Sequence, residues 1–512
     1  MKKLEVVLQD WEAVIGLEAH AELTTLESKM FCGCKLEFGA DPNTHTCPVC
    51  LGLPGALPVP NKAAIESIVL AGLATNCEIE KYSMFYRKNY MYPDMTKNFQ
   101  TTQGPIAFCM RGWLDLAVDG PAAKERIDLA EAVEQGSYTT RIGITRIHME
   151  EDAGKMNHIG GSEGRIAGAT HSLVDYNRCG TPLTELVTEP DLRTPEEARL
   201  FMQKLRQIYL TLGISDCSME EGSLRCDGNV SLRRRGAKEL GTKTELKNMN
   251  SFKNLHDGLA YEICRQAEVL ENGGIVYQET RHWDPTAKRT IVMRVKETAD
   301  DYRLFPDPDL APYNLSDEFI DCVRAKLPEL PDQKAERFAA EFGLSAYDTR
   351  HLVEHRATSN FFEACMEVAG DKALAKPLAN LIINDVAGYL NANDGIDLAE
   401  TPLSPARAVD LVKLIADETI SSKQAKEVFT AILEEDKDPS AIVEERGMQQ
   451  VSDTGAIDAV VEKVLAENPD KVEQYRGGKT GLIGFFVGQC MKEMRGQGNP
   501  KVINELLVQK LG

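Results

Sequence analysis

The chain has 512 residues, with 58 Lys and Arg against 79 Asp and Glu, which gives a formal net charge of −21. Hydrophobic residues make up 43% and charged residues 27%, which is ordinary globular usage and excludes disordered, collagen-like and mucin-like chains. The acidic balance also argues against a protein that coats nucleic acid through bulk positive charge, because such binding uses Lys and Arg to neutralise phosphates.

The first residues of the sequence do not predict an apolar targeting segment. Lys2 and Lys3 are followed by Glu5, Asp10 and Glu12, which interrupt any secretory apolar region. The longest apolar runs, such as residues 481–488, fall far short of the roughly 20 residues that cross a bilayer. We therefore expect a cytoplasmic protein without a membrane span.

The first predicted strand covers residues 14–20, the run VIGLEAH. Its two-residue period puts Glu18 and His20 on one face and apolar residues on the other. The run ITRIHMEED, residues 144–152, would likewise place His148, Glu150 and Asp152 on one face. Either run alone is more typical of a solvated strand face. The two runs indicate a functional site only if the fold brings them together.

Four cysteines between these runs form the pattern C-x-C-x12-C-x2-C, made by Cys32, Cys34, Cys47 and Cys50. Four thiolates in two close pairs suit tetrahedral zinc, and closed sites of this kind are structural. In a reducing compartment the clustering favours metal over disulfides. The alternatives are four buried free thiols, or His45 as a ligand between the pairs.

Several polar stretches resist a packing explanation. Residues 86–103 interleave Arg and Lys with Tyr and Phe, a mixture that can grip a single-stranded nucleic-acid end but also fits a surface loop over packed tyrosines. Residues 172–191, 219–233 and 243–252 together combine carboxylates, Asn, Arg and Lys. Such residues bind Mg²⁺ and phosphate, which supports a phosphoryl-transfer or nucleotide site without a P-loop, although any one stretch alone is more typical of solvated turns.

The predicted secondary structure of the chain changes near residue 301. Before it, residues 195–212 predict an amphipathic helix, and residues 229–235 and 242–248 predict a strand and a returning strand, so this part reads as α+β. The proline-rich run 301–313 reads as a loop or linker, and the remainder is helical in pattern. We therefore expect about three domains, in line with the length.

The expected domains are an N-terminal α+β domain over residues 1–303, with a zinc-binding insertion at 32–50, then all-α domains over 304–404 and 405–512. The last of these is divided in charge. Residues 411–470 carry 6 basic and 14 acidic side chains, net −8, whereas residues 471–512 carry 7 basic and 3 acidic, net +4.

Two motifs attract attention and are discounted. His351-x-x-Glu354-His355 fits a pattern of helical zinc proteases but has no evident third ligand, so a metalloprotease is a distant alternative. Gly478-Lys479-Thr480 looks like the end of a phosphate-binding loop, but that loop needs a glycine at position 473, where Glu473 stands.

Taken in their order along the sequence, the motifs resemble those of one family, the B subunits of the bacterial aspartyl/glutamyl-tRNA(Asn/Gln) amidotransferases. The resemblance covers essentially the whole chain. The resemblance is carried by the four cysteines and by the runs IGLEAH, YMYPDMTKNFQ, HMEEDAGK, SLVDYNRCGTPLTELVTEPD, EEGSLRCDGNVSLR, ELKNMNSF, DYRLFPDPDL and GLIGFFVGQCMKEMRGQGNP. Thr96 and Thr184 depart from the family pattern.

The resemblance implies a carbon–nitrogen ligase acting on Glu-tRNA(Gln), Asp-tRNA(Asn) or both. ATP activates the misacylated side-chain carboxylate as an acyl phosphate, which ammonia converts to the amide. The B subunit would hold this site, a glutaminase A subunit would supply ammonia, and a small C subunit would join the two. The implied fold is a cradle-like catalytic domain, then a helical domain, then a helical tail that contacts tRNA.

The resemblance also implies the site residues. It assigns Mg²⁺ to Glu18, His20, Glu150 and Glu185, with Glu151, Asp152 and Asp175 as supporting groups, and structural zinc to the four cysteines. It leaves ATP phosphate, ribose or the aminoacyl end to Arg225, Asp227, Asn229, Lys247 and Asn248. The alternative from another class is a non-catalytic scaffold that binds tRNA through its zinc knuckle and basic C-terminus.

Overall fold

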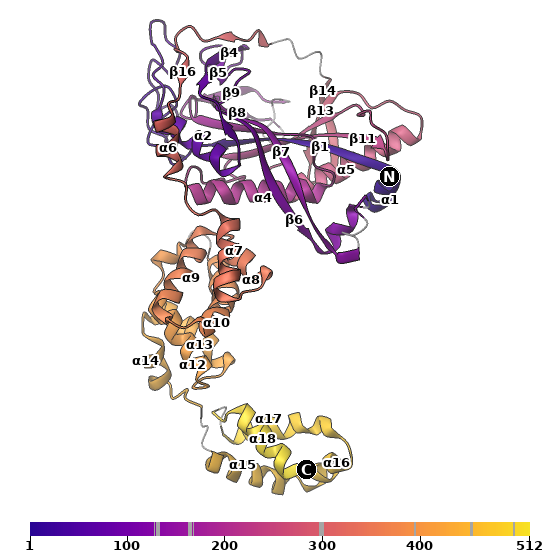
Figure 1. Ribbon diagram of the computed structural model, residues 1–512, viewed down its shortest axis with the longest axis vertical. Helices are drawn as coiled ribbons and strands as arrows, with labels where there is room; N and C mark the ends of the chain where they lie inside the picture. Colours follow the sequence, from indigo (N-terminus) through magenta and orange to yellow (C-terminus); the bar gives the residue numbers. More distant parts are fainter. Residues whose placement is uncertain are drawn as a thin grey trace. The chain divides into compact units, whose positions relative to one another are not determined.

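The computed structural model describes residues 1–126, 128–129, 134–161, 166, 168–295, 302–393, 396–450, 454–494 and 497–512. These residues form two compact units, Met1–Leu330 and Pro331–Gly512 (Figure 1). The first unit is a mixed α and β domain and the second is helical, as the sequence predicts. The division into three domains stays a prediction.

The first unit is built on a twelve-stranded sheet in the order β14-β13-β12-β11-β1-β10-β7-β5-β4-β15, with β6 paired to β7 and β2 paired to β6. Most neighbours are antiparallel, and β12 and β13 are parallel. The strands are β1 (Trp11–Glu22), β2 (Glu78–Ile79), β4 (Phe85–Asn89), β5 (Phe99–Gln103), β6 (Cys109–Asp119), β7 (Ser137–Glu151), β10 (Pro182–Thr188), β11 (Leu224–Arg234), β12 (Thr244–Lys247), β13 (Glu279–Asp284), β14 (Arg289–Val295) and β15 (Phe305–Pro306).

Two further pairs of short strands lie outside this sheet, and helices complete the unit. The pairs are β3 (Tyr82–Ser83) with β16 (Tyr313–Asn314), and β8 (Lys155–Ile159) with β9 (His171–Asp175). The helices are α1 (Leu4–Asp10), α2 (Lys62–Ala74), η1 (Gly120–Glu125), α4 (Pro195–Leu212), α5 (Phe252–Glu271) and α6 (Asp317–Arg324). The proline-rich run 301–313 was expected to be a loop or linker, and its residue 301 lies outside the described residues. Within this run, β15 pairs with β4.

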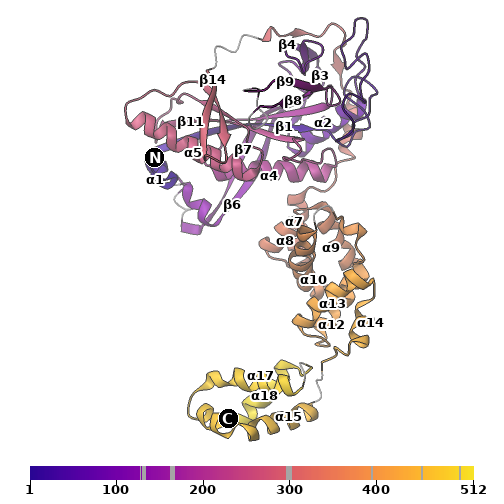
Figure 2. The ribbon, with the colours of Figure 1, turned by 180° about the vertical axis from the view of Figure 1, so that it is seen from behind.

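One face of the sheet is apolar and covered by α2, α4 and α5, which lie on the same side of it in Figures 1 and 2. Leu17 and Ala19 of β1 are buried in this core with Phe201 and Leu205 of α4 and Leu259 of α5. Because side chains alternate along a strand, the residues between them lie on the opposite, polar face. That alternation positions the candidate site.

Two elements predicted from the sequence are confirmed. Helix α4 begins at Pro195 and ends at Leu212, with Thr194 as its N-cap in a capping box with Glu197, and with Gly213 at a φ of 68° closing its C-terminus. Strands β11 and β12 pair as predicted, with Asn229 opposite Glu245, although β11 begins earlier, at Leu224.

A buried polar network fixes α5 to the sheet. Glu262 is fully buried, and its carboxylate accepts hydrogen bonds from Thr244 Oγ1 and Thr290 Oγ1, both at 2.9 Å. Arg265 Nη2 donates to it at 2.6 Å, and Arg281 Nε lies 3.5 Å away. Gln266 Nε2 donates to it at 3.2 Å as well, so five residues depend on one carboxylate.

We expect Glu262→Ala to lower the free energy of unfolding of the first unit by about 3–5 kcal/mol, because it leaves buried guanidinium and hydroxyl groups without their acceptor. Urea unfolding followed by tryptophan fluorescence reports this unit, since the three tryptophans of the chain all belong to it. The matched control on the same helix is Glu268→Ala at a half-exposed position, expected to change it by about 1 kcal/mol or less. Equal effects of the two substitutions would contradict the expectation.

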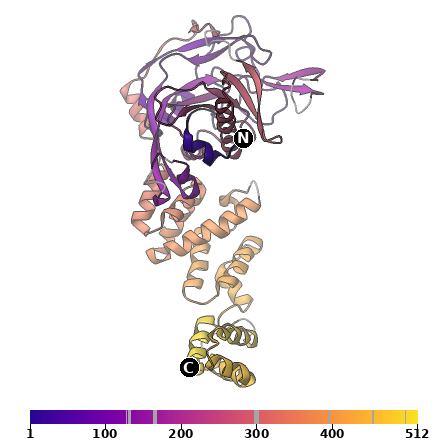
Figure 3. The same cartoon turned by 90° about the vertical axis from the view of Figure 1, so that its right-hand side faces the viewer.

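The second unit consists of helices, drawn from orange to yellow in Figure 3. They are α7 (Pro331–Phe342), α8 (Ala346–Leu352), α9 (Arg356–Ala369), η4 (Lys372–Leu374), α10 (Ala375–Asn380), η5 (Leu381–Val386), α11 (Ala387–Ala392), η6 (Leu398–Glu400), α12 (Pro405–Ala416), α13 (Ser422–Glu435), α14 (Pro439–Glu445), α15 (Thr454–Glu467), α16 (Pro469–Arg476), η7 (Thr480–Leu482), α17 (Ile483–Glu493) and α18 (Pro500–Leu511). Within the described part of the chain, no helix combines the length and apolar character needed to cross a membrane.

Candidate functional site

The polar face of the sheet gathers residues that are far apart in the sequence. Strand β10 lies between β1 and β7, and the antiparallel register places His20 opposite Glu185 and Glu185 opposite His148. On the other side of β1, Arg225 is opposite His20. Residues directly opposite each other in antiparallel strands project from the same face. One row across four strands is therefore Arg225, His20, Glu185 and His148.

Neighbouring rows continue this pattern. Glu18 is opposite Asp227 on β11, one row from His20 on the same face. Glu150 is opposite Leu183 on β10, one row away on the other side. The sequence did not show whether the runs around residues 18 and 150 lie close together. In the structure they meet across β10.

Two histidines and two carboxylates lie in contact within these rows. His20 Nε2 is 3.4 Å from Glu185 Oε2, and His148 Nε2 is 3.2 Å from the same oxygen and 3.3 Å from Glu150 Oε1. One ligand atom from each of His20, Glu150 and Glu185 can be chosen so that all lie within 4.8 Å of one another. A nitrogen and carboxylate oxygens at this spacing could hold a cation.

Glu150 is held rigidly although it is almost fully buried, with 4% of its surface exposed. Its carboxylate accepts hydrogen bonds from Gln100 Nε2 at 2.9 Å and from Thr102 Oγ1 at 2.7 Å, both on β5. Burial raises the pKa of Glu150, but the hydrogen bond from His148 and the charges of His148 and Lys88 together outweigh it and keep that pKa below the ordinary value. Glu150 is thus a preorganised anionic oxygen group that could hold a cation.

His148 links the two carboxylates. Burial by itself lowers the pKa of His148, but the carboxylates of Glu185 and Glu150 raise it to about 9. The same contacts lower the pKa of Glu185 well below its ordinary range, against the effect of burial. The strand period placed His148 on the correct face but indicated no role for it in the site.

The other residues expected at the site lie on its flanks. Glu18 accepts a hydrogen bond from Asn229 Nδ2 at 3.0 Å and lies on the same face, outside the group of three ligands. Lys247 Nζ donates to Asp227 Oδ2 at 2.5 Å. Asn248 has a positive φ of 66°, and its side chain donates to the Trp283 carbonyl at 3.3 Å.

Arg225 is paired with a buried carboxylate at the edge of the cluster. Its Nη2 donates to Asp152 Oδ2, and Arg178 Nε lies 3.8 Å from the same oxygen. Asp152 is 5% exposed. Two guanidinium groups, each paired with Asp152, therefore border the carboxylate cluster.

The four predicted cysteines meet. The Sγ atoms of Cys32, Cys34, Cys47 and Cys50 lie within 4.8 Å of one another, and the Cys47 amide donates to Cys50 Sγ at 3.1 Å. His45 is not part of this group. Four converging thiols are the donor set of a closed tetrahedral metal site, so the residues present fit a structural metal ion.

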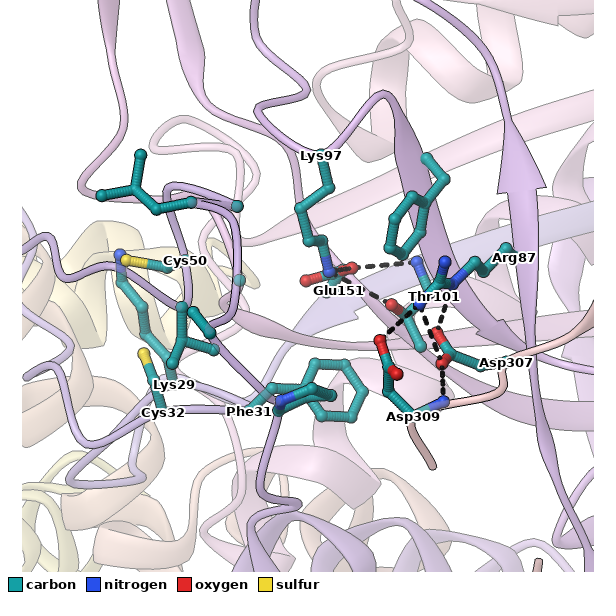
Figure 4. A pocket seen from close by; sticks show the side chains of 17 residues that line it. Lys29, Phe31, Cys32, Cys50, Arg87, Lys97, Thr101, Glu151, Asp307 and Asp309 are labelled. Carbon is teal, nitrogen blue, oxygen red and sulfur yellow. Dashed lines mark hydrogen bonds and ion pairs between the residues drawn. The ribbon is translucent and has the colours of Figure 1, made fainter. Parts of the chain in front are cut away.

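A cavity of about 210 Å³ lies between the cysteine loop and β5 (Figure 4). Glu151 points into it and pairs with Lys97, while Arg87 Nε donates to Asp307 at 2.9 Å. Glu150 and Glu151 thus serve opposite sides of β7, because consecutive strand residues point to opposite faces. Arg87 and Lys97, predicted to grip nucleic acid or to lie in a surface loop, are neutralised by carboxylates here.

The discounted motifs gain no support. Among the described residues, only the cysteine group and the His20 group bring three or more potential metal ligands together, and neither contains His351 or His355. The His351 Nδ1 atom lies 3.4 Å from Glu354 instead.

Comparisons with known proteins find matches along most of the chain. The family described as "GatB/GatE catalytic domain" matches residues 13–321, and that described as "GatB domain" matches residues 360–511. The chain is 50% identical to the B subunit of the aspartyl/glutamyl-tRNA(Asn/Gln) amidotransferase of Carboxydothermus hydrogenoformans, over 98% of this chain and 99% of the relative. The corresponding B subunits of Geobacter sp. (strain M21) and of a Picosynechococcus sp. are 49% and 48% identical, over at least 98% of each chain.

Proposed function

This chain belongs to the family of aspartyl/glutamyl-tRNA(Asn/Gln) amidotransferase B subunits, and from this premise we propose that it carries the ATP-dependent amidation step. The γ-phosphoryl group of ATP passes to the side-chain carboxylate of Glu-tRNA(Gln), Asp-tRNA(Asn) or both, releasing ADP. Ammonia then attacks the acyl phosphate and displaces phosphate, which leaves the amide. The enzyme is accordingly a glutamine-hydrolysing carbon–nitrogen ligase.

The convergence of His20, Glu150 and Glu185 carries this proposal. These residues, with Glu18 beside them, are assigned to Mg²⁺, which when bound neutralises charge on the transferred phosphoryl group. Gln100 and Thr102 fix the Glu150 carboxylate, and His148 fixes it against Glu185. Little covalent chemistry is required of the protein, because positioning and charge do most of the work in phosphoryl transfer.

The flanking residues are assigned to the substrates. Arg225 and Lys247 project from the same face as the cluster, and both can exchange a carboxylate partner for a phosphate oxygen. Asp227, Asn229 and Asn248 complete the assignment to ATP or the aminoacyl end. Cys32, Cys34, Cys47 and Cys50 are assigned to structural zinc.

The scaffold alternative is less favoured on physical grounds. Burying carboxylates costs free energy, and a cluster of them repels the phosphates of tRNA. A scaffold has no use for Glu150 and Glu185 held together on one face. A cation bound between these carboxylates offsets the free-energy cost of burying them, and the proposed catalysis requires such a cation.

Partners and location belong to the same proposal. We infer a glutaminase A subunit that supplies ammonia, a small C subunit that joins the glutaminase to this chain, and misacylated tRNA contacted by residues 471–512, whose net charge is +4. Translation substrates of this kind place the protein in the cytoplasm.

Reconstitution of the chain with its A and C partners tests the proposal. We expect amidation of Glu-tRNA(Gln) or Asp-tRNA(Asn) that requires ATP, forms one ADP per amide, and proceeds with ammonium chloride in place of glutamine. The matched control contains A and C without this chain, which we expect to be inactive with either nitrogen source. ATP-dependent amidation by A and C alone would instead support the scaffold.

A further inference from the structure

Lys29 is a fully buried lysine that the proposed reaction does not use. None of its surface is exposed. Its Nζ donates to the carbonyl of His45 at 2.8 Å and to the carbonyl of Tyr176 at 3.2 Å. Lysine is almost never fully buried unless it is paired. Both of these acceptors are neutral, so a negative charge to balance the ammonium must be sought nearby.

One source of such charge close to Lys29 is the cysteine group. Figure 4 shows the amino group of Lys29 beside Cys50, with Cys32 close to the same side chain. A methyl group built on Gly180 would lie 3.6 Å from Lys29 Cδ, 3.8 Å from Cys50 Cβ and 3.9 Å from Glu151 Oε2, so these three side chains flank one point. The Glu151 carboxylate is already paired with Lys97, which leaves the cysteine group as the unpaired source of negative charge for Lys29. Four thiolates around a divalent metal ion carry a net charge of about −2. The buried ammonium of Lys29 offsets part of this negative charge.

Lys29 also joins the cysteine loop to the loop that leads into β10. His45 lies between the two cysteine pairs, and Tyr176 follows β9. The ammonium of Lys29 therefore donates one hydrogen bond to each of the two loops. The His45 amide adds a hydrogen bond to Asn177 Oδ1 at 2.8 Å, and the Met30 amide adds one to the Gly180 carbonyl at 2.8 Å.

The second loop is in turn fixed to the catalytic face. The Gly180 amide donates to the Asp152 carbonyl at 3.0 Å, and the Asp152 amide donates to the Thr181 carbonyl at 2.8 Å. Thr181 precedes β10, which carries Glu185, and Asp152 follows β7, which carries Glu150. Contacts therefore run without a gap from the cysteines through Lys29 to the ends of both strands.

We propose that Lys29 is the positioning residue of the cysteine metal site: its ammonium is the counter-charge of the tetrathiolate metal and couples that site to the loop before β10. The inference rests on the zinc assignment in the proposed function. It adds a residue that binds neither metal nor substrate but determines how firmly the metal is held and where its loop lies.

The test compares zinc release from the full chain and from Lys29→Met, which keeps the length of the side chain but removes its charge and donors. Zinc per chain is measured by mass spectrometry of the metal, and release by transfer to a chromogenic chelator. We expect release about 10- to 100-fold faster from Lys29→Met, the range typical of losing a partner of the ligand shell. The matched control is Lys35→Met in the same loop, where Lys35 is exposed and pairs with Glu37, and release should be unchanged.

The outcomes separate the two proposals. Absence of zinc from the wild type would remove the zinc assignment itself. Zinc in the wild type, with equal release rates for wild type and Lys29→Met, would overturn the role of Lys29 alone. Equal acceleration by Lys35→Met would also overturn it, because the effect would then be one of loop charge in general.

A second measurement needs no variant and covers the case in which Lys29→Met does not fold. Hydrogen exchange of the wild-type chain is compared before and after chelator treatment. We expect faster exchange at amides of residues 29–50 and also of residues 176–181, with residues 279–292 unchanged as the internal reference. Faster exchange in residues 29–50 alone would overturn the coupling between the two loops.

Discussion

Replacing Glu150 by glutamine is expected to lower ATP-dependent amidation by about 10²–10³-fold, the effect typical of removing one preorganised charge-stabilising group from an active site. Glutamine keeps the shape of the side chain and can still accept a hydrogen bond from Thr102 Oγ1. It lacks the anionic oxygen that a cation needs. Initial rates of Gln-tRNA(Gln) or Asn-tRNA(Asn) formation by the reconstituted complex measure the loss.

The same preparation contains its own reference reaction. Hydrolysis of glutamine by the complex should stay measurable in Glu150→Gln and in Glu18→Gln, because the A subunit is proposed to carry it. Glu12→Gln is the matched control, since Glu12 lies at the far end of β1 and binds Arg193 and Arg233 instead. Amidation at the wild-type rate by Glu150→Gln would refute its assignment to the cation site.

Local features of the site followed from the sequence because they depend on neighbours in the chain. The two-residue period of a strand placed Glu18 and His20 on one face, and the structure confirms this in β1. The same rule separated Glu150 from Glu151, which contact opposite sides of β7. The cysteine spacing likewise predicted a cluster that the structure brings together.

The meeting of His20, Glu185 and Glu150 could not be predicted from the residues alone. It depends on the strand order β1, β10, β7 and on a register that a shift of one residue would reverse. Nothing local in the sequence sets that order. The family resemblance supplied the grouping of these residues at one site, without the strand order that brings them together.

The groups that support the cluster were missed for a similar reason. Gln100 and Thr102 belong to a run interpreted as a nucleic-acid grip or a surface loop, yet they form β5 and donate to Glu150. The two β-branched residues Thr101 and Thr102 were a signal for a strand. Which carboxylate they would meet depends on the pairing of β5 with β7, a contact across 48 residues.

Loss of the metal is the other change with a large expected effect. We expect Cys47→Ser to lower zinc from about one ion per chain to near zero, because a closed structural site needs all four thiolates. In small zinc domains such an ion contributes about 10–16 kcal/mol of apparent binding free energy at neutral pH, so its removal should loosen the loop that it closes. Metal analysis of the purified chain and limited proteolysis within residues 32–50 measure the two consequences.

Cys322→Ser is the matched control, since it makes the same chemical change at an exposed thiol outside the cluster. It should keep zinc and protease resistance at the wild-type level. Glu150 and Glu185, the carboxylates proposed to act in catalysis, lie on β7 and β10, outside the cysteine loop, so amidation by Cys47→Ser should fall less than in Glu150→Gln while glutamine hydrolysis persists. Full zinc content in Cys47→Ser would show that the ion is bound elsewhere. Amidation as low as in Glu150→Gln, from a chain that still resists proteolysis outside the loop, would give the cysteine site a catalytic role instead of a structural one.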